Sequence, residues 1–387
     1  MEIKRTFLPL IAVAALLAGA GCEDPAQRSA AGLQQAIDSL KSVYAPDARV
    51  AVWEVEAKPG GGTLTLSGKV DRPEWKQAIL GEAARRGLAA VDSITLLDGL
   101  RPEPWAIVKL SVASMRTDGR HSAEMATQAI MGTPVRLLEP KNDWYRAQTP
   151  DGYIAYVPAN SLELASQERL AQWKQAERYI VTAYSSRLVE TPGGDATVSD
   201  LVLGNILELR GQRAGWVKLA TPDGREGYVP ATDAAPLSAW AKQGFDAALV
   251  EATARRMNGS GYLWGGTSTK VTDCSGLAKV CYFACGIILQ RDASQQALCG
   301  TKIAAADWNT AQTGDLLFFG SSTGRVTHVG IYLRDGKYIH CSGRVKVNSV
   351  DPADDDYLST PFISISRIDG CVGQPGITAV REHPWYF

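Results

Sequence analysis

The spacing of hydrophobic and polar positions changes several times along the 387-residue chain, and each change predicts a different element. Between residues 30 and 100 the pattern predicts the order helix, strand, strand, helix, strand. Leu33, Ile37 and Leu40 share one face of the first helix. The other expected elements are strands over 50–55, 63–70 and 91–97, a glycine-rich turn over 58–62 and a helix over 75–86. A small α+β domain is therefore expected within residues 22–100.

The middle third of the chain contains an internal repeat with a spacing of 72 residues. Trp144 recurs as Trp216, and the turn at 149–152 (Thr-Pro-Asp-Gly) recurs at 221–224 without a gap. Short β-rich runs flank each Pro-Asp-Gly turn, as they do in small antiparallel sheets. Two β-barrels are expected over about 104–163 and 178–236, within domain boundaries of 101–165 and 166–240, and a helix over 166–177 is expected to join them.

The last third, residues 241–387, begins with helical patterns and continues with strand patterns. A helix is expected over 245–257, with Phe245, Ala248, Leu249 and Ala252 facing the core. A second apolar run begins at Cys274 and predicts a buried helix. The strands that follow are expected over 314–319, 328–333 and 337–341. Helices first and a sheet later indicate an α+β unit.

Cys274 stands in the first turn of the second helix, where unpaired backbone N–H groups favour a thiolate. Two of the four histidines follow on predicted strands, and we expect His328 to act as base and His340 to orient it. One alternative is a buried structural cysteine. The other is a Cys-His-His metal site, which we disfavour because structural zinc takes four ligands and no fourth is evident. We therefore expect a cysteine nucleophile and no cofactor.

Four ordered motifs resemble the NlpC family of bacterial cell-wall cysteine peptidases. They are Tyr-Leu-Trp-Gly-Gly at 262–266, Asp-Cys-Ser-Gly at 273–276, His-Val-Gly-Ile-Tyr at 328–332 and the second histidine at 340. The resemblance covers 241–387 and implies a papain-like α+β catalytic domain. The barrels ahead of it resemble SH3-like domains, so the chain is most similar to the dipeptidyl-peptidase VI subgroup. That subgroup implies cleavage between D-glutamate and the diamino acid of the peptidoglycan stem peptide.

The resemblance also implies roles around the nucleophile. Tyr262 would support the oxyanion and Trp264 would shape a subsite wall, although core packing is the alternative for Tyr262. Asp273 and Ser275 would hold substrate. An acidic residue beside a thiolate raises the thiol pKa, which suits a substrate-facing role for Asp273, and a helix N-cap is the alternative. Ser294, in the stretch Arg-Asp-Ala-Ser, matches a substrate-binding serine.

The first barrel is expected to contribute to the same site. Glu124 resembles an acidic residue that this subgroup extends towards the amine of the terminal L-alanine, and Tyr153 or Tyr156 would assist it. A solvated surface charge is the alternative for Glu124. Two carboxylates facing one subsite, Asp273 and Glu124, favour a substrate with a cationic end. His121 and His383 fit no motif and are expected on the surface.

The N-terminal residues have the pattern of an export signal. Two basic residues precede an apolar stretch over 7–17, and small residues over 18–21 precede Cys22. The stretch is too short to span a bilayer. The pattern resembles a lipoprotein signal over 1–21 with lipid on Cys22, except that Gly19 replaces the usual leucine, and an ordinary cleaved signal is the alternative. We expect an exported, periplasm-facing protein of the cell envelope.

Net charge and cysteine content limit the classes of partner that the protein is expected to bind. The net charge of −1 gives no electrostatic basis for binding nucleic acid or an anionic membrane surface. Seven cysteines form no Cys-x-x-Cys pair, and Cys281 and Cys285, one helical turn apart, are expected in the core rather than in a disulfide. The expected partners are peptidoglycan stem peptides, with membrane contact only through the lipid, and the expected state is a monomer.

The resulting fold class is multi-domain: a papain-like α+β catalytic domain preceded by two SH3-like β-barrels and a small N-terminal α+β domain. The N-terminal domain loosely resembles BON-type domains of envelope proteins, which serve attachment or spacing. Three functions compete. They are a γ-D-glutamyl-L-diamino acid peptidase for muropeptides with a free L-alanine, an endopeptidase or amidase for polymeric wall, and a binding protein with a decayed catalytic domain. The intact Cys-His-His set disfavours the third, and the two carboxylates favour the first.

Overall fold

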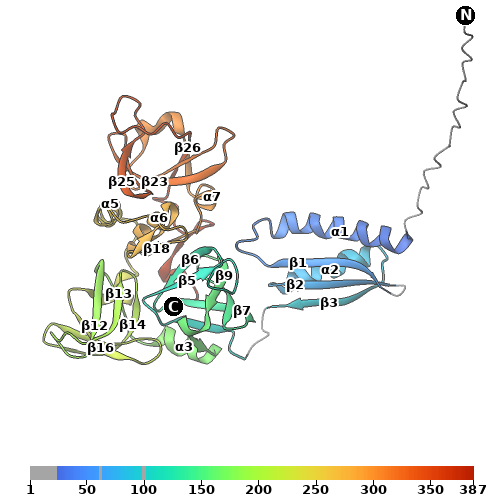
Figure 1. Ribbon diagram of the computed structural model, residues 1–387, viewed down its shortest axis with the longest axis horizontal. Helices are drawn as coiled ribbons and strands as arrows, with labels where there is room; N and C mark the ends of the chain where they lie inside the picture. The colour runs from blue at the N-terminus through green and yellow to red at the C-terminus, as the bar shows by residue number, and fades with distance from the viewer. Residues whose placement is uncertain (1–23, 61–62, 98–101) are drawn as a thin grey trace, which may run out of the picture. The chain divides into compact units, whose positions relative to one another are not determined.

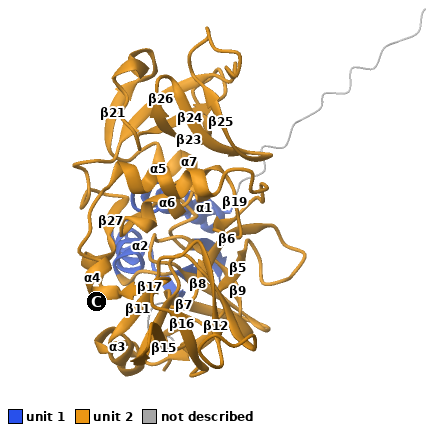
Figure 2. Cartoon of the chain, turned by 90° about the vertical axis from the view of Figure 1, so that its left-hand side faces the viewer, with its two compact units in different colours: residues 1–46, 54–70, 74–95 blue, residues 47–53, 71–73, 96–387 orange. Residues whose placement is uncertain are grey.

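The computed structural model describes residues 24–60, 63–97 and 102–387, so the predicted signal peptide and Cys22 lie outside the described residues. The chain divides into two compact units (Figure 2). The first comprises residues up to 46 with 54–70 and 74–95, and the second comprises 47–53, 71–73 and 96–387. None of the helices in the described ranges has the length and hydropathy needed to cross a bilayer.

The first unit has the predicted order of elements. They are α1 (Pro25–Tyr44), β1 (Trp53–Gly60), β2 (Thr63–Val70), α2 (Pro73–Arg85) and β3 (Ala90–Leu96), with the strands in the order β1-β2-β3. Buried and exposed positions alternate along β1 and β2, and Leu33, Ile37 and Ile79 of the helices are fully buried. One face of the sheet is therefore covered by the two helices (Figure 1). Residues 50–52, predicted as strand, precede β1 and belong to the second unit.

The second unit begins with two seven-stranded β-domains. The first β-domain contains β4 (Trp105–Val108), β5 (Val112–Arg116), β6 (Met125–Ile130), β7 (Pro134–Lys141), β8 (Trp144–Gln148), β9 (Ile154–Pro158), the 3₁₀ turn Ala159–Ser161 and β10 (Leu162–Ala165). The second β-domain contains β11 (Arg178–Val181), β12 (Ser185–Val189), β13 (Thr197–Val202), β14 (Ile206–Arg213), β15 (Trp216–Ala220), β16 (Glu226–Pro230) and β17 (Ala234–Pro236). Their strand orders, β10-β4-β7-β8-β9-β5-β6 and β13-β12-β16-β15-β14-β11-β17, are the same order read in opposite directions.

The sequence repeat is thus a structural repeat. Trp144 and Trp216 begin equivalent strands, and the partner strands carry register shifts at equivalent places, after Leu137 and after Leu209. The predicted linker helix is α3 (Gln167–Gln175), whose N-cap Ser166 accepts a hydrogen bond from the backbone N–H of Arg169 at 3.1 Å.

The remaining chain forms the α+β region (residues 237–387). Its elements are α4 (Leu237–Trp240), α5 (Ala247–Arg256), β18 (Thr267–Ser268), β19 (Val271–Thr272), α6 (Cys274–Ala284), β20 (Ile287–Leu289), α7 (Ala293–Gln296), β21 (Thr301–Ala304), the 3₁₀ segment Ala305–Thr310, β22 (Leu316–Gly320), β23 (Val326–Arg334), β24 (Lys337–Ser342), β25 (Arg344–Ser349), β26 (Phe362–Arg367), β27 (Ile377–Ala379) and the 3₁₀ turn Val380–Glu382. Six strands form the main sheet in the order β21-β26-β22-β23-β24-β25. The strands predicted over 314–319, 328–333 and 337–341 are its central members.

The main sheet has a different core on each face. On one face α6 contributes Leu277, which packs with Val329 and Ile339 in one buried cluster. On the other face Phe319 stacks on Tyr338 and on Phe362. Burying each such side chain contributes about 1.5–3 kcal/mol. The helix that begins with Cys274 is therefore fixed against the two strands that carry the histidines (Figure 1).

Two helix predictions need correction. Val250 and Ala254 of α5 are buried, and the predicted Phe245 and Leu249 also pack against this core, whereas the predicted Ala248 and Ala252 are exposed. The core face of α5 is therefore turned from the predicted one, because tertiary packing buries the Val250 side of the helix. The apolar run after Cys274 is also divided, because α6 ends at Ala284 and the next apolar residues form β20.

Candidate active site

The Asp-Cys-Ser-Gly motif forms the start of α6. Asp273 is the N-cap, and its carboxylate accepts a hydrogen bond from the backbone N–H of Gly276 at 2.7 Å. A Cβ atom on Gly276 would lie 2.0 Å from the carbonyl oxygen of Gly266, so only glycine lets the loop before α6 pack against the helix. This close packing places Cys274 as the first residue of the helix, with 9% of its surface exposed.

The two predicted histidines are in direct contact. His328 Nε2 lies 2.7 Å from His340 Nδ1. His340 Nε2 in turn lies 2.9 Å from Oδ1 of Asn348 on β25, and the Asn348 amide nitrogen donates to the backbone carbonyl of Asp356 at 2.7 Å. Asn348 was not predicted, because the sequence shows it only as one polar position in an alternating strand.

This chain of contacts defines where the imidazole protons lie. The Asn348 amide nitrogen is committed to a carbonyl, so the atom that faces His340 is an oxygen, which can only accept. His340 therefore carries its proton on Nε2 and accepts on Nδ1. His328 then donates from Nε2, which leaves His328 Nδ1 with a lone pair. His328 is thereby held in the tautomer that can remove a proton.

The nucleophile and base are both neutral in the free protein. Burial, followed by the Asp273 carboxylate, raises the pKa of the Cys274 thiol to about 11, although backbone N–H groups of Val329 and Ser275 act in the opposite direction. Burial, followed by the charges of His340 and Lys346, lowers the pKa of His328 to about 4. The thiolate expected from the helix N-terminus is therefore not the resting form, because desolvation outweighs the dipole.

A cleft of about 330 Å³ opens at Cys274. The predicted site residues that line it come from several elements and are Tyr262, Trp264, Asp273, Cys274, Ser275, Ser294, Glu124 and Tyr153. Thr327, the neighbour of His328, lines it as well. Residues that share the lining without having been predicted as site residues include Arg49, Thr117, Arg291, Asp292 and Arg325. The structure thus brings residues more than 150 positions apart in sequence to one site.

The comparisons with known proteins agree with this geometry. Residues 259–367 match the NlpC/P60 family, and residues 115–162 match the bacterial dipeptidyl-peptidase Sh3 domain. This chain contains an NlpC/P60 cysteine peptidase domain. The resemblance inferred from the four motifs is confirmed.

Two relatives of known name are similar to more than half of this chain. The chain is 29% identical over 258 residues to dipeptidyl-peptidase 6 of Lysinibacillus sphaericus, covering 64% of this chain and 92% of that protein. It is 27% identical over 229 residues to γ-D-glutamyl-L-lysine dipeptidyl-peptidase of Bacillus cereus, covering 56% and 67%. The crystal structure of an NlpC/P60 family protein from Bacillus cereus superposes with a TM-score of 0.59 at 21% identity, covering 68% of this chain and 99% of that one. This superposition shows a shared fold.

Within the NlpC/P60 domain, the carboxylate of Asp273 is not the free negative charge that the sequence suggested. It is buried and bonded to the Arg291 guanidinium at 2.5 Å, to the backbone N–H of Gly265 at 2.9 Å and to the Ser275 hydroxyl at 3.2 Å. The lone pairs of the Asp273 carboxylate are therefore taken up by the N-cap hydrogen bond from Gly276 and by the ion pair with Arg291. Asp273 is therefore not an unpaired carboxylate for an ammonium, because its charge is paired with the fully buried Arg291, whose role the sequence did not reveal.

Tyr262 and Trp264 frame the thiol. Tyr262 forms a parallel bridge to Thr272, which places its ring beside the start of α6. Burial, followed by the Cys274 and Asp273 charges, raises the pKa of the Tyr262 phenol, so the phenol keeps its proton and can donate. Trp264 lies at the rim with 59% of its surface exposed, as a subsite wall requires.

The SH3 domain forms the opposite side of the cleft. The backbone N–H of Thr267 donates to Gln128 on β6 at 2.8 Å, and Gly265, with φ of +83°, packs against the carbonyl of Met125. Glu124, the residue before β6, is exposed, and no ion pair joins it to a described lysine or arginine. Tyr153, which is largely buried, lines the same cleft. Glu124 is therefore a free carboxylate within the cleft.

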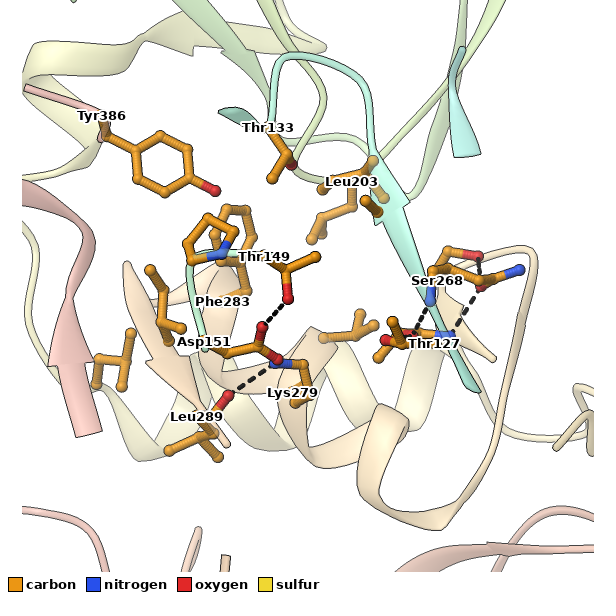
Figure 3. A pocket seen from close by; sticks show the side chains of 18 residues that line it. Thr127, Thr133, Thr149, Asp151, Leu203, Ser268, Lys279, Phe283, Leu289 and Tyr386 are labelled. Atoms are coloured by element: carbon orange, nitrogen blue, oxygen red, sulfur yellow. Dashed lines mark hydrogen bonds and ion pairs between the residues drawn. The ribbon is translucent and has the colours of Figure 1, made fainter. Parts of the chain in front are cut away.

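A second, largely apolar cavity lies between the SH3 domain and α6 (Figure 3). Asp151, from the repeated turn, points at Lys279 of α6 and forms an ion pair at 2.5 Å, while Lys279 also donates to the Leu289 carbonyl at 2.7 Å. Burial raises the pKa of Asp151, but the Lys279 charge outweighs it and the net pKa is lowered. Asp151 and Lys279 satisfy each other within the protein, so this ion pair joins the SH3 domain to α6 and its charges are not available to a ligand.

The remaining cysteines and histidines have structural positions. All six described cysteines are free and buried, which confirms that Cys281 and Cys285 are core residues. His121 is exposed as expected. The surface prediction for His383 is wrong, because it is buried and bonded to the Pro150 carbonyl at 2.9 Å. Within the described ranges, no group of three His, Cys, Asp or Glu residues could hold a metal ion.

Proposed function

We propose that this protein is a cysteine peptidase that hydrolyses the γ-D-glutamyl-L-diamino acid bond of peptidoglycan stem peptides bearing a free N-terminal L-alanine. The observation that carries the proposal is the lining of the cleft, which contains the nucleophile Cys274 and, from the SH3 domain, an unpaired Glu124. The names of the relatives point to the same bond, because they describe dipeptidyl-peptidases, one of them for γ-D-glutamyl-L-lysine.

The mechanism follows from the proton positions. His328 Nδ1 takes the thiol proton of Cys274 as Sγ attacks the γ-carbonyl carbon of D-glutamate. The phenol O–H of Tyr262 donates to the oxyanion, and a donor placed in this way supplies about 2.7–4 kcal/mol in comparable sites. The intermediate collapses to a thioester, and the departing amine of the diamino acid takes the proton from His328. A water molecule, deprotonated by the same nitrogen, then releases L-Ala-D-Glu and restores the thiol.

Selectivity for a free amine follows from the charges in the cleft. Asp273 is paired with Arg291, so Glu124 is the carboxylate open to a substrate ammonium. A charge-assisted hydrogen bond there contributes about 1.5–3 kcal/mol, or roughly ten- to hundredfold in kcat/KM. An alanine already acylated by the sugar loses this bond and adds bulk beside Glu124.

The test compares kcat/KM for L-Ala-γ-D-Glu-diamino acid and its N-acetylated form. Wild type should prefer the free amine by at least about tenfold, and Glu124→Gln should lose most of this preference. Glu103→Gln, an exposed glutamate of the same β-domain, serves as the matched control. Cys274→Ala should cut neither peptide. Equal cleavage of both peptides by wild type would favour the alternative function, hydrolysis of polymeric wall.

Several further parts of this proposal rest on the sequence. They are export to the cell envelope, lipid attachment at Cys22, a monomeric state and stem peptides as the partner. The second β-domain shares the strand order of the matched SH3 domain, which supports a second SH3-like module. For the first unit we propose the attachment or spacing role of BON-type domains, on its helix, strand, strand, helix, strand order.

A further inference from the structure

The segment 47–53, between α1 and β1, is part of the second unit and is fixed to its SH3 domain (Figure 2). The carbonyl of Arg49 accepts a hydrogen bond from the backbone N–H of Ile154 at 2.7 Å, and Val52 packs in a buried cluster with Leu97, Leu138 and Ile154. Asp71 holds the segment at its other end, accepting from the Val52 backbone N–H at 2.8 Å and from Arg136 at 3.1 Å. The segment therefore has a defined position.

This position brings Arg49 into the lining of the catalytic cleft. Its guanidinium binds Asp47 through Nε and Nη2, both at 2.8 Å. Nη1 donates to Asp292 Oδ2 at 2.8 Å and to Ser294 Oγ at 3.0 Å. Four of the five guanidinium N–H groups thus donate hydrogen bonds, two of them to Asp292 and Ser294, which line the cleft.

The contacts continue into α7. Gln295 is buried, donates from its side chain to Asp47 at 2.8 Å and accepts from the Asp292 backbone N–H at 3.0 Å. Asp47, Arg49, Asp292 and Gln295 therefore form a closed ring around the start of a four-residue helix. A helix this short has little stability of its own, so the ring fixes the orientation of Ser294.

The bond from Arg49 also determines how Ser294 can act. Because the hydroxyl oxygen accepts from Arg49, the hydroxyl proton is left to donate to an oxygen in the cleft. Asp292, which also lines the cleft, is ion-paired with the same guanidinium and lies 3.8 Å from Arg291. Glu124, by contrast, forms no ion pair with a described lysine or arginine.

We propose that Arg49 is a positioning residue that sets Ser294 and Asp292 to receive the amino-terminal end of the stem peptide. Ser294 donates to an oxygen of the bound peptide, and because Asp292 is already held in ion pairs, Glu124 is the carboxylate that receives the substrate ammonium. This inference rests on the proposed function. It gives the segment between α1 and β1 a part in substrate selection.

The geometry requires an arginine at position 49. The planar guanidinium binds Asp47 with two parallel hydrogen bonds while its third nitrogen reaches Asp292 and Ser294. The ammonium of a lysine has a single nitrogen and cannot make all of these bonds at once. Arg49→Lys should therefore retain a positive charge beside Asp292 and lose the simultaneous hold on Ser294. Its KM should lie between those of wild type and Arg49→Ala.

The experiment measures kcat and KM of the full chain for L-Ala-γ-D-Glu-diamino acid in Arg49→Ala, Arg49→Gln, Arg49→Lys, Ser294→Ala and the Arg49→Ala/Ser294→Ala pair. Arg49→Ala should raise KM about tenfold and leave kcat within about twofold. The KM of the double variant should be no higher than that of Arg49→Ala alone, because Arg49→Ala already removes the role of Ser294. Arg187→Ala, an exposed arginine on β12, should behave as wild type and is the matched control.

The outcomes separate this inference from the proposed function. If wild type does not cut the peptide, the proposed function fails. If wild type cuts it and the Arg49 variants keep its KM, or if the losses of Arg49→Ala and Ser294→Ala multiply, the positioning role is wrong. Arg49→Gln preserves the size of the side chain, so a change in KM there, at an unaltered melting temperature, reports on the cleft even if Arg49→Ala folds poorly.

Discussion

A neutral thiol facing a neutral imidazole makes proton transfer part of the attack on the substrate. Burial raises the pKa of Cys274 and lowers that of His328, so an ion pair between them does not form in the free enzyme. His328 must then have a lone pair on Nδ1 before the substrate binds. The hydrogen bonds from His328 through His340 to Asn348 keep the proton of His328 on Nε2 and so leave this lone pair.

The pH dependence of kcat/KM tests the state of the base. A histidine whose pKa is lowered to about 4 is already neutral at pH 5. We therefore expect kcat/KM to be constant from about pH 5 to 7.5 and to fall only below about pH 5. An ordinary, solvated histidine would give half-maximal activity near pH 6.5. Rates measured at subsaturating tripeptide report the free enzyme, and an acid limb at pH 6–7 would show that His328 is hydrated.

Asn348 gives a second prediction at this scale. Asn348→Ala removes the acceptor for His340 Nε2–H, so His340 can adopt the other tautomer and His328 can lose its lone pair on Nδ1. We expect kcat to fall about 10- to 100-fold with KM unchanged. Asn348→Asp keeps an acceptor and should retain more activity. Asn258→Ala, an exposed position, is the control, and equal activity in all variants would contradict the tautomer argument.

At the scale of elements, the sequence predicted those whose pattern is local. The 72-residue repeat predicted both β-domains closely, because each copy carries its own tryptophan and turn. The catalytic strands were predicted because His328 and His340 lie in alternating segments. The core face of α5 was predicted only in part: Phe245 and Leu249 pack against the core, whereas Ala248 and Ala252 are exposed because tertiary packing buries the side of the helix that carries Val250 and Ala254.

The candidate site was predictable as far as its motifs reach. Cys274, His328 and Tyr262 belong to motifs with fixed spacing, whereas Asn348 and Arg49 do not, and the stretch that begins with Arg291 pointed only to Ser294. Their roles depend on partners distant in sequence, such as the 243 positions between Arg49 and Asp292. No local pattern encodes such a pairing, so the compensation of Asp273 by Arg291 could not be foreseen.

At the scale of the whole molecule, the second unit depends on contacts between its domains. The two copies of the repeated turn have diverged in this respect. Asp223 binds Arg225 two residues away, at the surface of its own β-domain. Asp151, its counterpart, instead reaches Lys279 on the helix that carries the nucleophile (Figure 3). One copy of the repeat has thereby become part of the catalytic assembly.

Asp151→Asn should therefore destabilise the second unit far more than Asp223→Asn does. The substitution leaves Lys279 with an unpaired charge at a site where both side chains are largely buried, and breaking such a pair costs about 3–5 kcal/mol, against about 0–1 kcal/mol for an exposed pair. Asp151→Asn/Lys279→Met should recover much of the loss, because no unpaired charge is left.

The pKa of Asp151 is lowered on folding, so its contribution to stability is present above the unfolded pKa near 3.9 and disappears as the pH falls through the lower folded value. Urea unfolding at pH 7 and at pH 3 measures both effects, and equal losses for the two aspartates at pH 7 would show that the domains do not depend on this pair.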